Sequence, residues 1–227
     1  MKINKFFLIL WITVFGLFGR TQAQVYDSTY RPKRFKEQLA KFNAEPITKN
    51  EYVFLGNSIT AGTDWSRLLI LPQARNRGIP GDITFGVLER LQEVIDRKPA
   101  KVFILIGIND ISRNIPDSVI LRNHKKIIER IREGSKKTQI YVYTLLPVNA
   151  SFEKYKKTHF GKDEHILFIN NEIRKYVAKK VSVIDLYPHF LDENNMMRKE
   201  LTTDGLHLNS EGYKVWADIL HNGGYLK

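Results

Sequence analysis

The sequence predicts a single α/β domain of three layers, in which helices cover both faces of a parallel β-sheet. Three observations predict this fold class. The chain has 227 residues, enough for one domain with a hydrophobic core. Short apolar runs alternate with segments whose apolar residues recur at helical spacing. One run, "VFILIG", is apolar without alternation, as expected of a central strand that is covered on both faces.

Five apolar runs are predicted strands, and three segments between them are predicted helices. The strands are expected at residues 52–56, 73–77, 102–107, 140–146 and 181–186. The helical stripes are Leu88, Leu91 and Ile95, then Ile120, Ile127 and Ile131, and then Ile166, Ile169, Ile173 and Val177. Each stripe offers one apolar face to the sheet. Strands that alternate with helices imply right-handed crossovers between parallel strands.

The first 23 residues have the layout of a secretory signal peptide. Lys2 and Lys5 precede an apolar run from Phe6 to Phe18, and small or polar residues follow as far as Ala23. The alternative is a permanent membrane anchor, but the uninterrupted apolar run is shorter than the roughly 20 residues that span a bilayer. We therefore expect a periplasmic or secreted protein that has no stable membrane insertion after cleavage.

The remaining sequence divides into an N-terminal extension and the main domain. Residues 24–50 form the predicted extension, with one helix around Phe35 to Phe42. Residues 51–227 form the predicted domain, without an internal repeat. A long polar connection at 147–164 follows the fourth strand, and such connections on the carboxyl side of a sheet often shape binding sites.

Composition excludes several kinds of chemistry. The chain has no cysteine, which rules out disulfides, a cysteine nucleophile, thiolate metal sites and lipid attachment to cysteine. The formal net charge is +12, and removing residues 1–23 leaves +9. This excess can attract anionic partners, but the basic residues are scattered among acidic ones, which favours a solvated surface. Nothing resembles a nucleic-acid-binding module. The sequence makes no prediction of oligomeric state.

Four short stretches rich in glycine and polar residues stand after predicted strands or near the C-terminus. They are "GNSIT" (56–60), "GIPGD" (78–82), "GIND" (107–110) and "DGLH" (204–207). Ligands of parallel sheets bind outside the carboxyl ends of the strands, so these stretches are candidate sites of chemistry. Each also has a structural interpretation. Ser58 can cap a helix, Asp82 can cap the helix that runs towards Arg97, and Asn109 can occupy a turn.

The four stretches together indicate nucleophilic catalysis. Adjacent strands lie about 4.8 Å apart, so Ser58, Gly81 and Asn109 come side by side if the first strand lies between the second and third. Asp204 and His207 are close enough for the carboxylate to accept an imidazole N–H. The oxyanion of a tetrahedral intermediate would then have three donors: the N–H groups of Ser58 and Gly81 and the amide of Asn109.

In this order, and over nearly all of residues 51–221, the four stretches resemble those of the SGNH hydrolases, also called the GDSL-like esterase and lipase family. The resemblance implies a flavodoxin-like sheet with strand order 2-1-3-4-5. The residue roles that it implies are Ser58 as nucleophile, Gly81 and Asn109 as oxyanion donors with Ser58, His207 as general acid and base, and Asp204 as its partner. One departure is Asn57, where many members have Asp. Because this residue is not part of the triad, the change concerns the fine positioning of the site and not the class of reaction.

The predicted function is that of a serine esterase without metal or organic cofactor, acting through an acyl-enzyme. Export, together with similarity to carbohydrate esterases of this family, favours short-chain O-acetyl esters on carbohydrates as substrates. A lysophospholipase or an acyl-thioesterase is the enzymatic alternative. A non-catalytic glycan-binding module, or a flavin-binding flavodoxin-like module that uses "SITAGT" at 58–63, is the alternative from another class.

A few other side chains have open interpretations. Asp185 is the reserve carboxylate for His207, and Trp65 either lines the acyl pocket or packs in the core. His124 lies on an apolar helical stripe and is interpreted as a packed residue. Asn149 begins a glycosylation sequon, which has meaning only if the host glycosylates. The lysines of the 147–164 connection that could meet an anionic substrate are Lys154, Lys156, Lys157 and Lys162.

Overall fold

A computed structural model of the chain describes residues 26–227, apart from 177 and 179. The predicted signal peptide therefore lies outside the described residues. The described part forms a five-stranded parallel sheet in the order β2-β1-β3-β4-β5, which confirms the predicted fold class and strand order. The strands are β1 (Tyr52–Gly56), β2 (Ala74–Gly78), β3 (Lys101–Leu105), β4 (Gln139–Tyr143) and β5 (Val181–Ile184).

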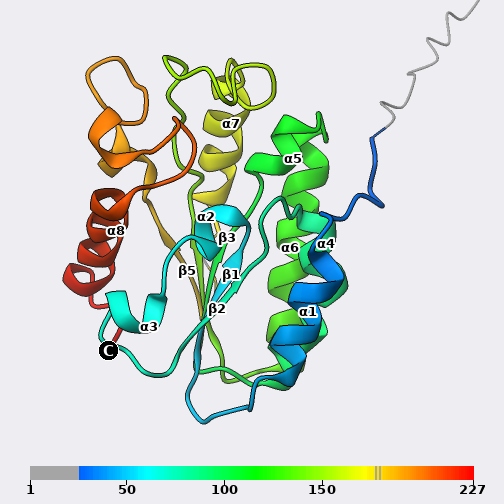
Figure 1. Cartoon of the computed structure of the whole chain (residues 1–227). Helices are drawn as coiled ribbons and strands as arrows, with labels where there is room; N and C mark the ends of the chain where they lie inside the picture. Colours follow the sequence, from blue (N-terminus) through cyan, green and yellow to red (C-terminus); the bar gives the residue numbers. More distant parts are fainter. Residues whose placement is uncertain (1–25, 177, 179) are drawn as a thin grey trace, which may run out of the picture.

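Helices cover both faces of this sheet (Figure 1). The α-helices are α1 (Phe35–Ala44), α2 (Ser58–Ala61), α3 (Trp65–Leu68), α4 (Thr84–Asp96), α5 (Ile108–Ser112), α6 (Asp117–Gly134), α7 (Asp163–Ile173) and α8 (Ser210–Asn222). Two short 3₁₀ helices, η1 (Tyr187–Phe190) and η2 (Lys199–Leu201), precede α8. Figure 1 shows α1, α4 and α6 on one side of the sheet and α3 and α8 on the other. Within the described residues, no helix combines the length and apolar character needed to cross a bilayer.

Burial explains why the strands and helices form where they do. All five residues of β1 and of β3 are buried, because both strands are interior and covered on both faces. The predicted stripe residues Leu91, Ile120, Ile127 and Ile131 are fully buried on α4 and α6. The third stripe lies on α7 as far as Ile173, the last residue of that helix, and Val177 lies outside the described residues.

Aromatic side chains fill the face of the sheet below α8. Trp65 is 1% exposed and stacks on Phe54 with ring centroids 4.2 Å apart, while Trp216 meets its edge at 4.8 Å. Offset or edge-to-face aromatic pairs of this kind stabilise a core beyond their buried area. Of the two interpretations of Trp65, the structure therefore supports packing in the core.

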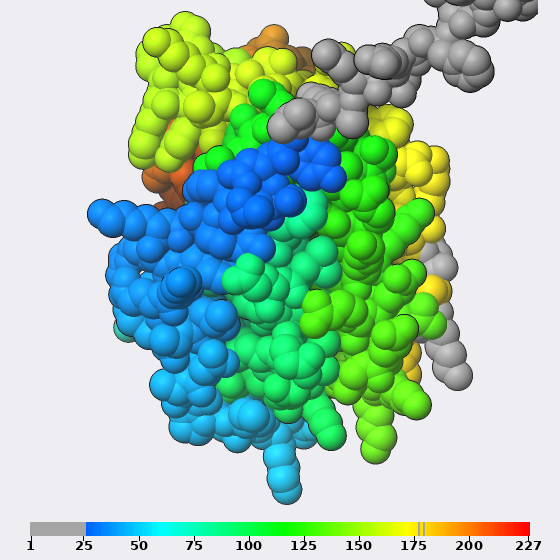
Figure 2. All heavy atoms as spheres, turned by 90° about the vertical axis from the view of Figure 1, so that its right-hand side faces the viewer, coloured from blue at the N-terminus to red at the C-terminus, as the bar shows by residue number. Residues whose placement is uncertain are grey.

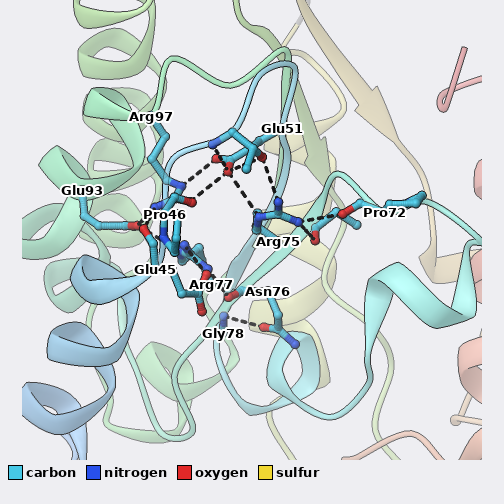
Figure 3. Close-up of polar contacts among 12 residues, drawn as sticks. Glu45, Pro46, Glu51, Pro72, Arg75, Asn76, Arg77, Gly78, Glu93 and Arg97 are labelled. Atoms are coloured by element: carbon cyan, nitrogen blue, oxygen red, sulfur yellow. Dashed lines mark hydrogen bonds and ion pairs between the residues drawn. The ribbon is translucent and has the colours of Figure 1, made fainter.

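Charged residues form a paired group at the amino end of the sheet, which we call the amino-edge cluster (Figure 3). Its members are Glu45, Glu51, Arg75, Arg77, Glu93 and Arg97. Figure 3 shows Arg97 and Arg75 reaching Glu51 from different sides. Arg97 Nε donates to Glu51 at 2.6 Å and Arg75 Nε at 3.2 Å. The cluster attaches the end of α1 to the sheet and to α4.

One local expectation is wrong, and one sequence motif is buried. Asp82 does not cap α4, whose N-cap residue is Ile83. The carboxylate of Asp82 instead pairs with the buried Arg90 at 2.9 Å, and Asp110 accepts the backbone N–H and the hydroxyl of Thr84. The sequon asparagine Asn149 is fully buried and donates to a backbone carbonyl, so it is not available for glycosylation.

Candidate active site

The four predicted stretches meet at the carboxyl edge of the sheet, the upper end in Figure 1. Ser58 begins α2 directly after β1, Gly81 lies in the turn between β2 and α4, and Asn109 lies in α5 just after β3. His207 lies in the segment between η2 and α8. Together with Tyr155 and other residues, these side chains line one pocket of about 570 Å³. The parallel topology thus places residues 149 positions apart at one opening.

The turn after β1 exposes Ser58 because its neighbours satisfy the local backbone. Asn57, rather than Ser58, is the N-cap of α2, and its side chain accepts the N–H of Ile59 at 2.9 Å. Glycine is required at position 56, since a Cβ there would lie 2.2 Å from Thr60 Oγ1 and 2.3 Å from the carbonyl oxygen of Leu105. The hydroxyl of Ser58 is therefore not used in capping.

That hydroxyl contacts His207. Ser58 Oγ lies 2.9 Å from His207 Nε2, and His207 Nδ1 lies 3.1 Å from Asp204 Oδ2 and 3.2 Å from Asp204 Oδ1. A carboxylate only accepts, so Nδ1 carries the proton of the neutral ring and Nε2 presents its lone pair to Ser58. This geometry allows the imidazole to take the serine proton.

Asp204 is held as an ionised group. Burial raises the pKa of its carboxyl, but hydrogen bonds from the backbone and side-chain N–H groups of His207, with a smaller contribution from Lys154, hold that pKa below its usual value. The backbone N–H of His207 donates to Oδ1 at 2.9 Å, and the Lys154 ammonium lies 3.2 Å from Oδ2. Lys154 is thus the lysine of the 147–164 connection that reaches the site's carboxylate.

Two further groups that the sequence associates with the site face the same pocket. Gly81 has φ +82°, a backbone conformation that side chains disfavour, and it lies on the pocket wall. Asn109 is 8% exposed, and its Nδ2 donates one hydrogen to the carbonyl oxygen of Asp82 at 2.9 Å. An amide nitrogen has two hydrogens, so one remains for a ligand in the pocket.

The reserve carboxylate does not reach the site. Asp185 accepts from Thr144 Oγ1 at 2.8 Å and from Arg174 Nε at 2.8 Å, which uses both of its oxygens. His124 also lies apart. It is buried, its ring bonds to the carbonyl oxygen of Ile106 at 2.9 Å, and burial lowers its pKa to about 4, as expected of a packed neutral histidine.

Sequence reasoning did not identify several residues of the pocket wall. The 147–164 connection contributes Tyr155, Thr158 and His159, and the segment ahead of α1 contributes Asp27 and Tyr30. The length and polarity of the connection indicated a role in the site without indicating which residues serve it.

The segment ahead of α1 is fixed on the surface by aromatic and charged contacts. Tyr30 lies under the Arg113 guanidinium, and Tyr26 stacks on Phe85 with ring centroids 6.0 Å apart. Figure 2 shows this segment, in dark blue, against green atoms of the α4 and α6 side, with the yellow-green 147–164 connection projecting nearby. Within the part of the chain that is described, no group of three or more His, Asp or Glu residues could hold a metal ion.

Comparisons with known proteins agree on one family. A family model described as the GDSL-like lipase/acylhydrolase family matches residues 54–215. The isoamyl acetate-hydrolyzing esterase of Saccharomyces cerevisiae is 27% identical over 192 residues, which cover 79% of this chain and 78% of the yeast protein.

Solved structures also resemble the chain. A Streptococcus pneumonia structure named for platelet activating factor is 28% identical with a TM-score of 0.77, covering 86% of this chain and 94% of its own. A GDSL-like lipase from Bacteroides thetaiotaomicron is 23% identical with a TM-score of 0.72, covering 83% of this chain and 96% of its own. The second likeness concerns the fold alone.

Proposed function

Because this chain belongs to the GDSL-like lipase/acylhydrolase family and is a carboxylic ester hydrolase, we propose that it is a serine esterase that acts through an acyl-enzyme on short-chain esters, above all O-acetyl groups of carbohydrates. One observation carries the mechanism. The hydroxyl of Ser58, the ring of His207 and the carboxylate of Asp204 form one chain of hydrogen bonds whose serine end lies in the pocket. This arrangement is that of a nucleophile, its base and an orienting acid.

In the proposed reaction, Ser58 Oγ attacks the ester carbonyl carbon while His207 Nε2 takes the hydroxyl proton. The carbonyl π electrons move to oxygen, and the oxyanion accepts from the free Asn109 hydrogen and from the backbone N–H groups of Ser58 and Gly81. The carbon–oxygen bond to the alcohol then breaks, and His207 gives its proton to the leaving alcohol. Water repeats these steps on the acyl-enzyme, releasing the acid and restoring Ser58.

Asp204 supports this reaction without exchanging a proton. Its carboxylate fixes the tautomer of His207 and stabilises the imidazolium that forms when Ser58 loses its proton. The low pKa of Asp204 suits this role, because the carboxylate stays charged while the ring changes its protonation state. No step requires a metal or organic cofactor.

Three features support an acetyl group on a hydroxylated alcohol as the substrate. The yeast relative is named for hydrolysis of an acetate ester. The pocket wall mixes charged and aromatic side chains, among them Asp27, Tyr30, Arg113 and Tyr155, and such side chains can bind a sugar through its hydroxyl groups and ring faces. The predicted signal peptide would deliver the enzyme to polysaccharides outside the cytoplasm.

An ester panel tests this function. We expect hydrolysis of p-nitrophenyl acetate and of acetylated mono- and oligosaccharides, and loss of both activities in the Ser58→Ala variant. Acyl chains of about eight carbons should be poor substrates, because each added methylene needs apolar surface to bury. A strong preference for the long chains would reject the carbohydrate proposal in favour of a lysophospholipase or thioesterase. Full activity of Ser58→Ala would reject the serine mechanism.

Export is proposed on the sequence alone. The expected mature N-terminus is Gln24, after cleavage behind Ala23. N-terminal sequencing or intact-mass measurement of protein from the periplasm or the medium checks it. Recovery of the full-length chain from the cytoplasm would contradict the proposal.

A further inference from the structure

His159 is a buried histidine in the pocket wall to which the proposed reaction assigns no role. It comes from the 147–164 connection and is 9% exposed. Its Nε2 lies 3.2 Å from Asn109 Oδ1, and its Nδ1 lies 2.9 Å from Thr158 Oγ1. Both ring nitrogens thus have a partner, and one partner is the side chain proposed to stabilise the oxyanion.

The protons of this group can be assigned from its contacts. Asn109 Nδ2 faces a backbone carbonyl, that of Asp82, so the amide oxygen is the atom that faces His159. A carbonyl oxygen only accepts, and therefore His159 Nε2 carries a hydrogen. Burial first, and then the nearby charges of His207 and Lys162, lower the pKa of His159 to about 4, so the ring is neutral at pH 7. Nδ1 then accepts the Thr158 hydroxyl hydrogen.

These assignments hold the Asn109 amide at both ends. Its oxygen accepts from His159, and one hydrogen of its nitrogen is donated to the carbonyl oxygen of Asp82. A rotated amide would place its NH₂ group against the His159 N–H and its oxygen against the carbonyl, and both contacts would then be repulsive. Only the observed rotamer leaves the second Nδ2 hydrogen free for the pocket.

We propose that His159 is a positioning residue, which acts through Asn109 by holding the amide so that its free hydrogen faces the oxyanion. The inference rests on the proposed function, because it gives a role to a group that acts on the same intermediate. Preorganised donors stabilise developing charge best when they need not reorient during the reaction. His159 itself is not proposed to touch the reacting atoms.

The rest of the connection supports such a role, since it contacts the site at several points. Tyr155 packs edge-on against both His159 and His207, with ring centroids 5.2 and 5.4 Å apart. Lys162 Nζ donates to the carbonyl oxygens of Ile111 and Ser112 at 2.9 and 3.2 Å, which attaches the connection to α5, the helix that carries Asn109. His159 is therefore held from both sides along the chain.

Steady-state hydrolysis of p-nitrophenyl acetate tests the inference. We expect His159→Leu to lower kcat by about tenfold with little change in KM, because the lost interaction matters in the transition state. His159→Gln should recover most of kcat, since its amide N–H can donate to Asn109 Oδ1. The control is His165→Gln, which alters a half-exposed histidine paired with Asp117 and should leave kcat unchanged.

The decisive measurement is a double-mutant cycle with Asn109→Ala. If His159 acts through Asn109, His159→Leu should lower kcat by less than about twofold in the Asn109→Ala background. A further tenfold loss there, or unchanged kcat of His159→Leu in the parent, would overturn the inference. Full activity of Asn109→Ala or Ser58→Ala would overturn the proposed function instead.

A milder variant keeps the test independent of folding. Thr158→Val removes only the hydroxyl that fixes His159 Nδ1, and we expect it to lower kcat about threefold in the parent and not at all with Asn109→Ala. Thermal unfolding of each variant is measured alongside. If His159→Leu does not fold, equal effects of Thr158→Val in both backgrounds would overturn the inference.

Discussion

The two edges of the sheet use charged and polar residues in opposite ways. At the amino edge, the Glu51 side chain has no exposed surface and accepts from Arg97, Arg75 and Thr48, so its bonding capacity is used within the protein. At the carboxyl edge, the Ser58 hydroxyl contacts His207 and borders a pocket of about 570 Å³. The sheet thus gains stability at one edge from charged groups such as Glu51 that bond within the protein, and at the other edge it presents a hydroxyl to a pocket.

The two edges also differ in protonation. Burial raises the pKa of Glu51, but hydrogen bonds from Arg97 and Thr48 hold it below its usual value, so this carboxylate stays charged. Near the carboxyl edge, burial outweighs the partners. It raises the pKa of Asp110 to about 7 and lowers that of His124 to about 4. On acidification, the protonation states of Asp110 and His124 should therefore change before that of Glu51 in the amino-edge cluster.

The largest effect is expected from removing the proposed nucleophile at the carboxyl edge. Ser58→Ala should lower kcat by at least about 10,000-fold, because removing a triad nucleophile removes covalent catalysis. Its free energy of unfolding should stay close to that of the parent, since the hydroxyl is only partly buried. Ester hydrolysis measures the change in kcat, and urea unfolding measures the free energy of unfolding. A large loss of stability would show that the carboxyl edge is also structural.

Removing a charge at the amino edge should have the reverse effect. Glu51→Gln removes the closer anionic partner of the Arg97 guanidinium, which is only 2% exposed and then keeps Glu93 at 3.2 Å, and we expect a loss of about 3 kcal/mol in the free energy of unfolding. Under conditions where the variant is folded, kcat should be unchanged. Glu37→Gln, at an exposed ion pair on α1, is the matched control and should unfold like the parent. A variant as stable as this control would remove the contrast between the edges.

The pH dependence of stability sharpens the difference in protonation. The unfolded chain protonates His124 near pH 6.5, whereas the folded chain does so near pH 4, so this residue makes stability fall as the pH falls through that window. The parent should lose about 3 kcal/mol more than His124→Gln between pH 7 and pH 4. Asp110 contributes with the opposite sign in both proteins and cancels in the difference. Parallel stability curves from urea unfolding would contradict this expectation.

The smallest effect is expected where a charge contact at the active site is exposed. Lys154 lies 3.2 Å from Asp204, but its side chain is 65% exposed, and solvent screens such pairs. Lys154→Ala should therefore change kcat by less than about fivefold at moderate salt. Steady-state kinetics at low and high salt check this. A much larger loss would mean that the Asp204 carboxylate depends on this surface charge for its proposed role.

Much of the fold was predictable because its signals are local. All five strands lie within a few residues of the predicted runs, even β2, an edge strand that contains Arg75 and Arg77. Short helices such as α3 and α5 were not predicted, since four or five residues are too few to show a helical period. Ser58, His207 and Asp204 share one hydrogen-bonded chain at the predicted edge, because a parallel sheet brings the ends of its strands together.

The sequence by itself determined the fold class, the strand order through its family resemblance, and the residues at the strand ends. Only the tertiary structure decided between partners. It paired Asp204 rather than Asp185 with His207. At the start of α4, the N–H of Thr84 donates to Asp110 and not to Asp82. The structure also placed His159 beside Asn109. The physical reason is that periodicity and turn chemistry depend on neighbours along the chain, whereas a hydrogen bond depends on distances set by the packing of remote segments.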